Sequence, residues 1–143
     1  MDDLDRKLLA ALAADSSTST SMLGRRFQVA RSTVQARVER MERNGIIAGY
    51  TVKLGVVALA RRIKATALVQ VEPRTTASVL ARLKSIPEIE IAHTTSGRFD
   101  LILQIAVETT SDLDDVLDKI GAITGVRGSE SLIQLTTKFD RSV

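Results

Sequence analysis

The sequence predicts an α+β protein in two parts: a helical first third, and a longer second part in which strands and helices alternate. Two observations predict it. Apolar residues recur at helical spacing up to about residue 43, and beyond residue 63 one apolar pattern occurs twice, offset by 36 to 37 residues. The length of 143 residues, with 44% hydrophobic and 26% charged residues, is typical of small globular domains.

The first two helices are expected close to the N-terminus. Leu4, Leu8 and Leu12 lie about one helical turn apart and predict the first helix, with acidic residues at its start. A polar Ser/Thr loop follows and can supply an N-cap for a short second helix over residues 22–27. Residues 28–30 then form a tight connection to the next element.

The third helix lies in the first third of the chain, which holds all the excess positive charge. It begins at Arg31 or Ser32 and ends near Arg43, where Gly45 can adopt a left-handed conformation. Residues 46–52 follow with the pattern of a strand. Three helices with a tight turn between the second and third, followed by a strand, predict a winged helix-turn-helix.

The exposed face of this third helix has the chemistry of a DNA-reading surface. Residues 25–43 hold six arginines and two glutamates, a net charge of +4, whereas residues 56–143 are neutral overall. With Val34, Val38 and Met41 facing the core, polar side chains face base edges and arginines hold phosphates of double-stranded DNA. An amphipathic surface helix without a ligand is the alternative. The candidate DNA contacts are Arg31, Ser32, Thr33, Gln35, Ala36, Arg37, Arg40 and Arg43.

Two segments around the helix-turn-helix carry a family resemblance. The sequences LDRKLL at 4–9 and RVERMERNGIIAGY at 37–50 resemble the N-terminal half of the Lrp/AsnC regulators, the feast/famine transcription factors. Gln28 stands in the turn where this family often has Gly, and Ala30 stands where it often has an N-capping Ser. Ser32 is therefore the alternative cap of the third helix.

The second part of the chain reads strand, helix, strand twice. This is a βαββαβ unit of the ferredoxin-like type, which the resemblance also implies for the family's regulatory domain. The expected strands are 63–72, 89–96, 99–107 and 126–137, and the expected helices are 75–85 and 111–120. The expected domains are a DNA-binding domain at 1–53, a linker at 54–62 and an effector-binding and oligomerisation domain at 63–143.

One face of the predicted sheet has no helix to cover it. Its expected apolar members are Leu68, Ala92, Ile102, Ala106 and Leu132. Because such a patch is too apolar to stay in water, a second copy of the sheet is the predicted cover, giving a homodimer of the dimeric α+β barrel type. The resemblance implies further assembly to a tetramer or octamer. The single histidine, at position 93, is expected on this face of the sheet.

A glycine-containing hairpin is the candidate effector site. Gly97 can make a tight turn whose backbone N–H groups bind a carboxylate, and Asp100 can bind an ammonium group. The alternative is that both residues serve the hairpin alone. The resemblance implies an amino-acid effector, while Arg98 departs from the residue common there and leaves the effector's identity open. The candidate effector contacts are Thr95, Ser96, Gly97, Arg98, Phe99, Asp100, Gly125 and Val126.

Composition excludes several classes of site. Without cysteine and with one histidine, the chain offers no disulfide, no thiolate or multi-histidine metal site, and no cofactor is expected. Apolar runs are too short to span a membrane, and the acidic start is unlike a signal peptide, so a cytoplasmic protein is expected. No nucleophile, phosphate-loop or metal motif predicts an enzyme. An effector-independent architectural DNA-binding protein and a small dimeric α+β barrel enzyme remain the alternatives to a metabolite-responsive regulator.

Overall fold

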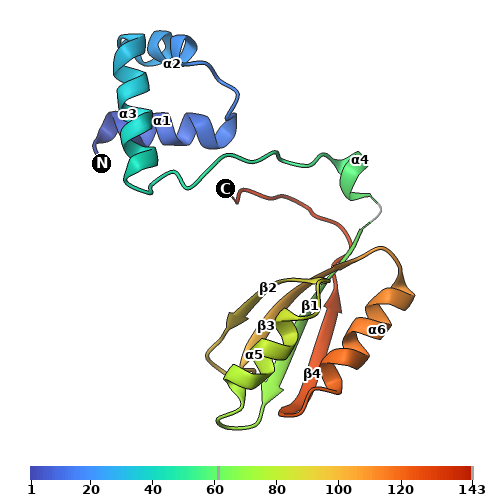
Figure 1. Ribbon diagram of the computed structural model, residues 1–143. Helices are drawn as coiled ribbons and strands as arrows, with labels where there is room; N and C mark the ends of the chain where they lie inside the picture. Colours follow the sequence, from blue (N-terminus) through green and yellow to red (C-terminus); the bar gives the residue numbers. More distant parts are fainter. Residues whose placement is uncertain (61, 143) are drawn as a thin grey trace. The chain divides into compact units, whose positions relative to one another are not determined.

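The computed structural model describes residues 1–60 and 62–142 (Figure 1). They form two compact units, whose main spans are Met1–Lys53 and Leu54–Asp140, and each is considered by itself. Arg61 in the expected linker and Val143 at the end of the expected second domain lie outside the described residues.

The first unit is a three-helix bundle with a small core. Its helices are α1 (Asp3–Ala14), α2 (Thr20–Phe27) and α3 (Arg31–Arg43). Side chains from all three helices are buried together because each helix turns one apolar stripe inward. The buried core consists of Leu8, Ala11, Leu23, Val34 and Met41.

The turn between α2 and α3 is tight, as expected. Gln28 adopts the left-handed conformation at φ 58°. Ala30, not Ser32, is the N-cap of α3: its carbonyl accepts hydrogen bonds from the backbone N–H groups of Thr33 and Val34, and no side chain caps the helix. The alternative start capped by Ser32 is therefore wrong, because the chain is already helical at Arg31.

The strand expected at 46–52 is also wrong. These residues, all of them described, form no strand, and Val52 is 78% exposed. An extended segment needs a partner strand for its N–H and C=O groups, and the first unit supplies none among residues 1–53. The unit is a helix-turn-helix without a wing. The short helix α4 (Val56–Leu59) lies in the segment expected to be the linker.

The second unit has the predicted βαββαβ order, with one antiparallel sheet of strand order β2-β3-β1-β4 (Figure 1). Inward-facing residues of β1 and β3 are fully buried in alternation, which is typical of a sheet with one face covered by helices. The helices α5 and α6 supply that cover. The elements are β1 (Ile63–Val71), α5 (Thr76–Lys84), β2 (Ile89–Thr94), β3 (Leu101–Val107), α6 (Thr110–Gly121) and β4 (Val126–Ile133).

All four strands are shorter than expected, although β1 loses only its last residue and ends at Val71. β2 ends at Thr94, β3 begins at Leu101 and β4 ends at Ile133. Residues 95–100 therefore form a connecting turn, because Gly97 has φ 119° and Asp100 donates its backbone N–H to Val69 rather than to β2.

The uncovered face of the sheet differs from the expectation at one strand. A register shift between Ile89 and Ile91 places Ile91 opposite Gln104 and His93 opposite Ile102, both on the uncovered face. Ala92 pairs with buried Leu103 and so lies on the helix-covered face, which corrects its expected position. The bulge thus replaces an alanine by a larger apolar residue on the uncovered face.

Candidate DNA-binding and effector sites

Helix α3 presents the predicted polar face. Val34 and Met41 are buried in the core, and the remaining sides of the helix contact water to different degrees. Thr33 and Arg37 are half-buried, and the exposed candidate residues are Arg31, Ser32, Gln35, Ala36, Arg40 and Arg43. The structure thus brings all eight predicted DNA contacts onto the surface of one helix.

Two of these arginines are already paired with α1. Arg40 Nη2 lies 2.7 Å from Asp5 Oδ2, and Arg37 Nη1 lies 3.3 Å from Asp5 Oδ1. Arg37 also donates to the carboxylate of Asp2. Asp5 is only 1% exposed, so its charge is held by these partners and not by water.

The charges of this cluster shift one another's protonation. The Arg37 guanidinium and the backbone N–H of Asp5 lower the pKa of Asp2 from 3.8 to about 2. Burial raises the pKa of Asp5, but hydrogen bonds from the backbone of Asp2 and from Arg37, with the charge of Arg40, leave that pKa below its ordinary value. The pKa of Arg37 is raised by its bonds to the same two carboxylates. Asp2, Asp5 and Arg37 are therefore ionised at neutral pH.

The other candidate residues of α3 form no ion pair with any of the described residues. Arg31 Nε donates to Thr20 Oγ1 at 3.3 Å, and Gln35 donates to Glu39 on the same helix at 3.1 Å. Arg43 has no ion pair with any of residues 1–60 and 62–142. The sequence analysis missed Asp2 and Asp5, because they lie 32 to 35 residues before their arginine partners and no local pattern links them.

The predicted effector segments meet at one end of β1. On one side, Asp100 donates its N–H to Val69 and accepts the N–H of Val71 on Oδ2, both at 2.9 Å. On the other side, the carbonyl of Gly125 accepts the N–H of Glu72 at 2.7 Å. Because β3 and β4 both flank β1 in the sheet, segments 25 residues apart in the chain lie on either side of one strand end.

The turn at 95–100 is held by its own hydrogen bonds. Thr95 donates its N–H to the carbonyl of Asp100 and its hydroxyl to the carbonyl of Phe99. Gln70 donates to the carbonyl of Arg98 at 2.8 Å, and the Arg98 guanidinium lies 5.3 Å from the centre of the Phe99 ring. This cation–π contact points Arg98 along the turn. Ser96 and Gly97 are exposed at its tip.

Position 125 requires glycine for two reasons: its backbone conformation, and the lack of room for a side chain. Its φ is 103°, and an added Cβ would lie 2.8 Å from Thr75 Oγ1. The neighbouring Val126 is half-buried and packs on the sheet core. The Gly125 segment is thus built for close approach between β4 and the start of α5, whatever ligand binds nearby.

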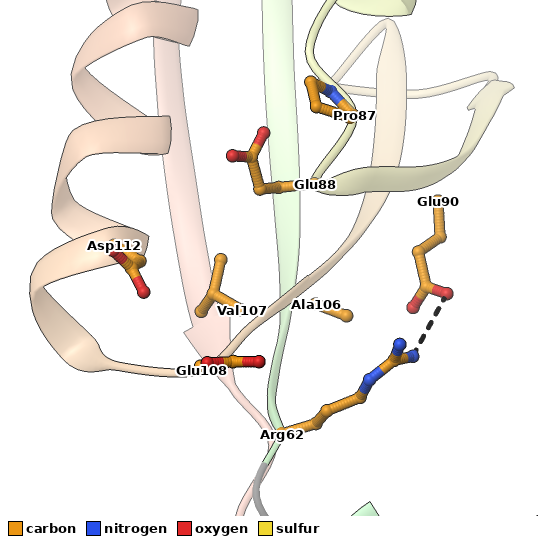
Figure 2. A pocket seen from close by; sticks show the side chains of 8 residues that line it. All are labelled: Arg62, Pro87, Glu88, Glu90, Ala106, Val107, Glu108 and Asp112. Atoms are coloured by element: carbon orange, nitrogen blue, oxygen red, sulfur yellow. Dashed lines mark ion pairs between the residues drawn. The ribbon is translucent and has the colours of Figure 1, made fainter.

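An acidic cavity of about 390 Å³ lies elsewhere in the second unit (Figure 2). It holds four carboxylates against one guanidinium, that of Arg62, which lies 3.9 Å from Glu90. None of the eight predicted effector residues lines it. Within the described residues, no group of three or more His, Asp or Glu side chains is placed to hold a metal ion. Its lining residues are Arg62, Pro87, Glu88, Glu90, Ala106, Val107, Glu108 and Asp112.

Comparison with known families decides the identity of the two units. The AsnC-type helix-turn-helix domain matches residues 1–42, and the Lrp/AsnC ligand binding domain matches residues 64–143. The chain belongs to the Lrp/AsnC family. Like its relatives, this Lrp/AsnC protein is a helix-turn-helix transcriptional regulator, which confirms the predicted fold class and family.

Relatives align with this Lrp/AsnC protein over almost its full length. The transcriptional regulator LrpA of Mycobacterium tuberculosis is 32% identical over 142 residues, covering 99% of this chain and 95% of LrpA. The structure of Escherichia coli AsnC matches with a TM-score of 0.90 and 28% identity, over 100% of this chain and 97% of AsnC. The feast or famine regulatory protein of M. tuberculosis, solved with L-methionine, matches with a TM-score of 0.85 and 31% identity, over 98% and 95% of the two chains. Among the described residues, no helix is long and apolar enough to cross a membrane.

Proposed function

We propose that this protein binds double-stranded DNA in the cytoplasm as a homodimer, through α3 of each copy, and that a free amino acid controls its assembly. The observation that carries the DNA-binding part is the exposed polar and arginine-bearing face of α3 directly after the helix-turn-helix turn. Such a helix places its N-terminal residues against base edges in the major groove. Ala36 is small enough for contact with a thymine methyl group.

The salt dependence of binding tests this role of α3. Arg43→Gln is expected to weaken binding to all duplexes alike and to make the slope of log affinity against log salt shallower by about 0.9, the loss of one phosphate contact. Arg82→Gln, an equal change at an exposed position of α5, is the control. Gel shifts with upstream genomic fragments measure both. Absence of binding to every fragment would overturn the proposal.

The uncovered face of the sheet supports the homodimer. Leu68, Ile91, Ile102 and Leu132 lie on it, and Leu132 is 60% exposed in one copy. A second copy of the same sheet buries this face by a two-fold axis, which also presents two recognition helices to a near-palindromic site. Larger assemblies, a tetramer or octamer, need a further contact between dimers.

The end of β1 is the proposed effector site. Asp100 is exposed, and its Oδ2 accepts the Val71 N–H, so Oδ1 is the proposed partner of a ligand ammonium group. Backbone N–H groups near Gly97 are the proposed donors for the ligand carboxylate. The complex of a relative with L-methionine supports an amino acid as the ligand class.

Two substitutions at one position separate binding from folding. Asp100→Asn keeps an oxygen for the Val71 N–H and removes the charge, whereas Asp100→Ala removes both. A screen of the twenty amino acids by thermal shift, then calorimetry with the best of them, is expected to show loss of binding in both variants but loss of stability mainly in Asp100→Ala. Unchanged binding in Asp100→Asn would move the site elsewhere.

A second candidate is a DNA-binding protein of architectural type without an effector. The observation that favours it is the structural use of Asp100, which holds the hairpin to β1 and so has a role without any ligand. No amino acid binding at millimolar concentration, together with intact DNA binding, would favour this function. The helix-turn-helix unit argues against an enzyme, and we propose that the protein has no catalytic activity of its own.

A further inference from the structure

Asp5 joins the cap of α1 to the arginines of α3. Its Oδ2 accepts the backbone N–H of Asp2 at 3.2 Å and Arg40 Nη2 at 2.7 Å, while its Oδ1 accepts Arg37 Nη1 at 3.3 Å. Asp2 completes the group, accepting the backbone N–H of Asp5 and a second bond from Arg37. These four side chains, Asp2, Asp5, Arg37 and Arg40, are called the acidic clasp below.

The acidic clasp changes the charge that α3 offers to a polyanion. Residues 25–43 carry a net charge of +4, and subtracting the two aspartates of the clasp leaves +2. The guanidiniums of the clasp are partly withdrawn, since the side chains of Arg37 and Arg40 are 28% and 47% exposed. A phosphate therefore has to compete with a fixed carboxylate for each of them, whereas Arg31 and Arg43 have no carboxylate partner among the described residues.

We infer that Asp5 is a positioning residue of the DNA-binding surface: it holds Arg37 and Arg40 against α1, and so limits how many phosphates α3 neutralises. The inference rests on the proposed DNA-binding function and adds to it. Phosphate contacts carry no sequence information. The loss of two of them therefore lowers the affinity for every duplex by the same factor. The share of affinity that comes from base contacts at the N-terminal end of α3 rises in consequence.

This position of Asp5 is fixed by the fold. A carboxylate that is 1% exposed cannot turn to water, and its three acceptor contacts come from the start of α1 and from two successive turns of α3. A substitution that removes the charge of Asp5 and keeps its shape therefore frees the guanidiniums of Arg37 and Arg40 together. By contrast, Asp3 lies on the exposed side of the same helix and pairs with Lys7 at 2.9 Å, away from α3. Asp3 is therefore a matched control for charge.

The test compares Asp5→Asn with Asp3→Asn in the full-length protein. The probes are a duplex enriched from a random library by the wild-type protein and a scrambled duplex of the same composition, and affinity is measured by fluorescence anisotropy over a range of salt. For Asp5→Asn we expect tighter binding to the scrambled duplex at low salt and a slope steeper by about 1 to 2, at ~0.9 per phosphate. Because both duplexes gain the same phosphate contacts, the ratio of the two affinities is expected to stay close to that of the wild type. Asp3→Asn adds the same charge and is expected to leave the slope unchanged.

A merely structural role for Asp5 predicts a different result. In that case Asp5→Asn lowers the melting temperature, both affinities fall with the folded fraction, and the slope stays that of the wild type; this outcome overturns the inference. Wild-type protein that binds neither duplex overturns the proposed DNA-binding function, and with it the inference.

Two further variants keep the test decisive if Asp5→Asn does not fold. Asp2→Asn removes the more exposed carboxylate of the clasp, and a slope steeper than that of Asp3→Asn, by up to about 0.9, is expected as Arg37 is loosened. A slope equal to that of Asp3→Asn overturns the inference. Where Asp5→Asn folds, adding Arg40→Gln is expected to reverse part of the steepening, and a slope that does not respond argues that Arg40 was never released.

Discussion

At the scale of single residues, Gln28 is the one that turns the chain from α2 into α3, and it does so with a left-handed backbone. A residue with a Cβ is strained there by about 1 kcal/mol, whereas glycine is not. Gln28→Gly is therefore expected to raise the free energy of unfolding of the helix-turn-helix by up to ~1 kcal/mol, reduced by the greater freedom of glycine in the unfolded chain. Hydrogen exchange of the α2 and α3 amides measures this unit by itself.

Gly24, on α2 and packed against the same turn, provides the opposite case. An added Cβ would lie 2.8 Å from the carbonyl oxygen of Val29, which belongs to the backbone of the turn. Gly24→Ala is expected to destabilise the unit by roughly 1 to 3 kcal/mol, because the turn has to open to admit a methyl group. Equal protection in Gly24→Ala and wild type would show that the turn yields without cost.

The carboxylate of Asp2 gives the first unit a dependence on acid. Its pKa is lowered from 3.8 to about 2 in the folded protein, chiefly by the hydrogen bond from Arg37. Because the folded pKa is the lower one, the stabilisation is fully present above about pH 4 and is lost as pH falls toward 2. In Asp2→Asn, stability measured by urea unfolding between these pH values is expected to fall less steeply than in wild type. An unchanged acid limb would assign the loss to other carboxylates.

At the scale of elements, helices and strands with internal partners were predictable and the segment without one was not. Alternation in β1 and β3 fixes their buried faces, so their positions follow from sequence. Residues 46–52 have the sequence pattern of a strand, but their unit contains no second strand to pair with them. A local sequence pattern does not reveal whether such a partner strand exists. The bulge before Ile91 was also beyond prediction, because one extra residue reverses a face without changing composition.

The uncovered face of the sheet leads to a prediction about dimerisation. Ile102 lies between Leu68 and His93 in the register, so neither of its direct neighbours on the sheet carries a like charge to that of Ile102→Glu. In a dimer the same carboxylate is removed from water within the interface, at a cost of several kcal/mol. Light scattering on the full-length variant is expected to show monomers, whereas Ser78→Glu, at an exposed position of α5, is expected to remain dimeric. Ile102→Glu that stays dimeric would show that another surface joins the copies.

At the scale of the whole molecule, the sequence predicts where charge lies but not which charges are available. A count over residues 25–43 gives +4, and only the fold reveals that carboxylates of Asp2 and Asp5 reach into that stretch from α1. The effector segments are a second case in which the sequence predicts the residues but not their arrangement in space. Residues 95–100 and 125–126 follow from the resemblance, but their meeting at the end of β1 depends on the strand order.

Dimerisation and DNA binding are expected to be coupled although they use different units of the chain. In a dimer, binding of one α3 brings the second to the same duplex at high local concentration, which raises affinity by about 100-fold or more over a single helix. Ile102→Glu, a substitution in the second unit, is therefore expected to weaken binding to the enriched duplex by at least that order. Because a monomer neutralises about half as many phosphates, its salt slope is expected to be roughly half that of wild type. Ser78→Glu adds an equal charge to the same unit and should retain both values. A monomeric Ile102→Glu that binds with wild-type affinity and slope would show that each copy reads DNA independently, and that the second face of the sheet serves another purpose.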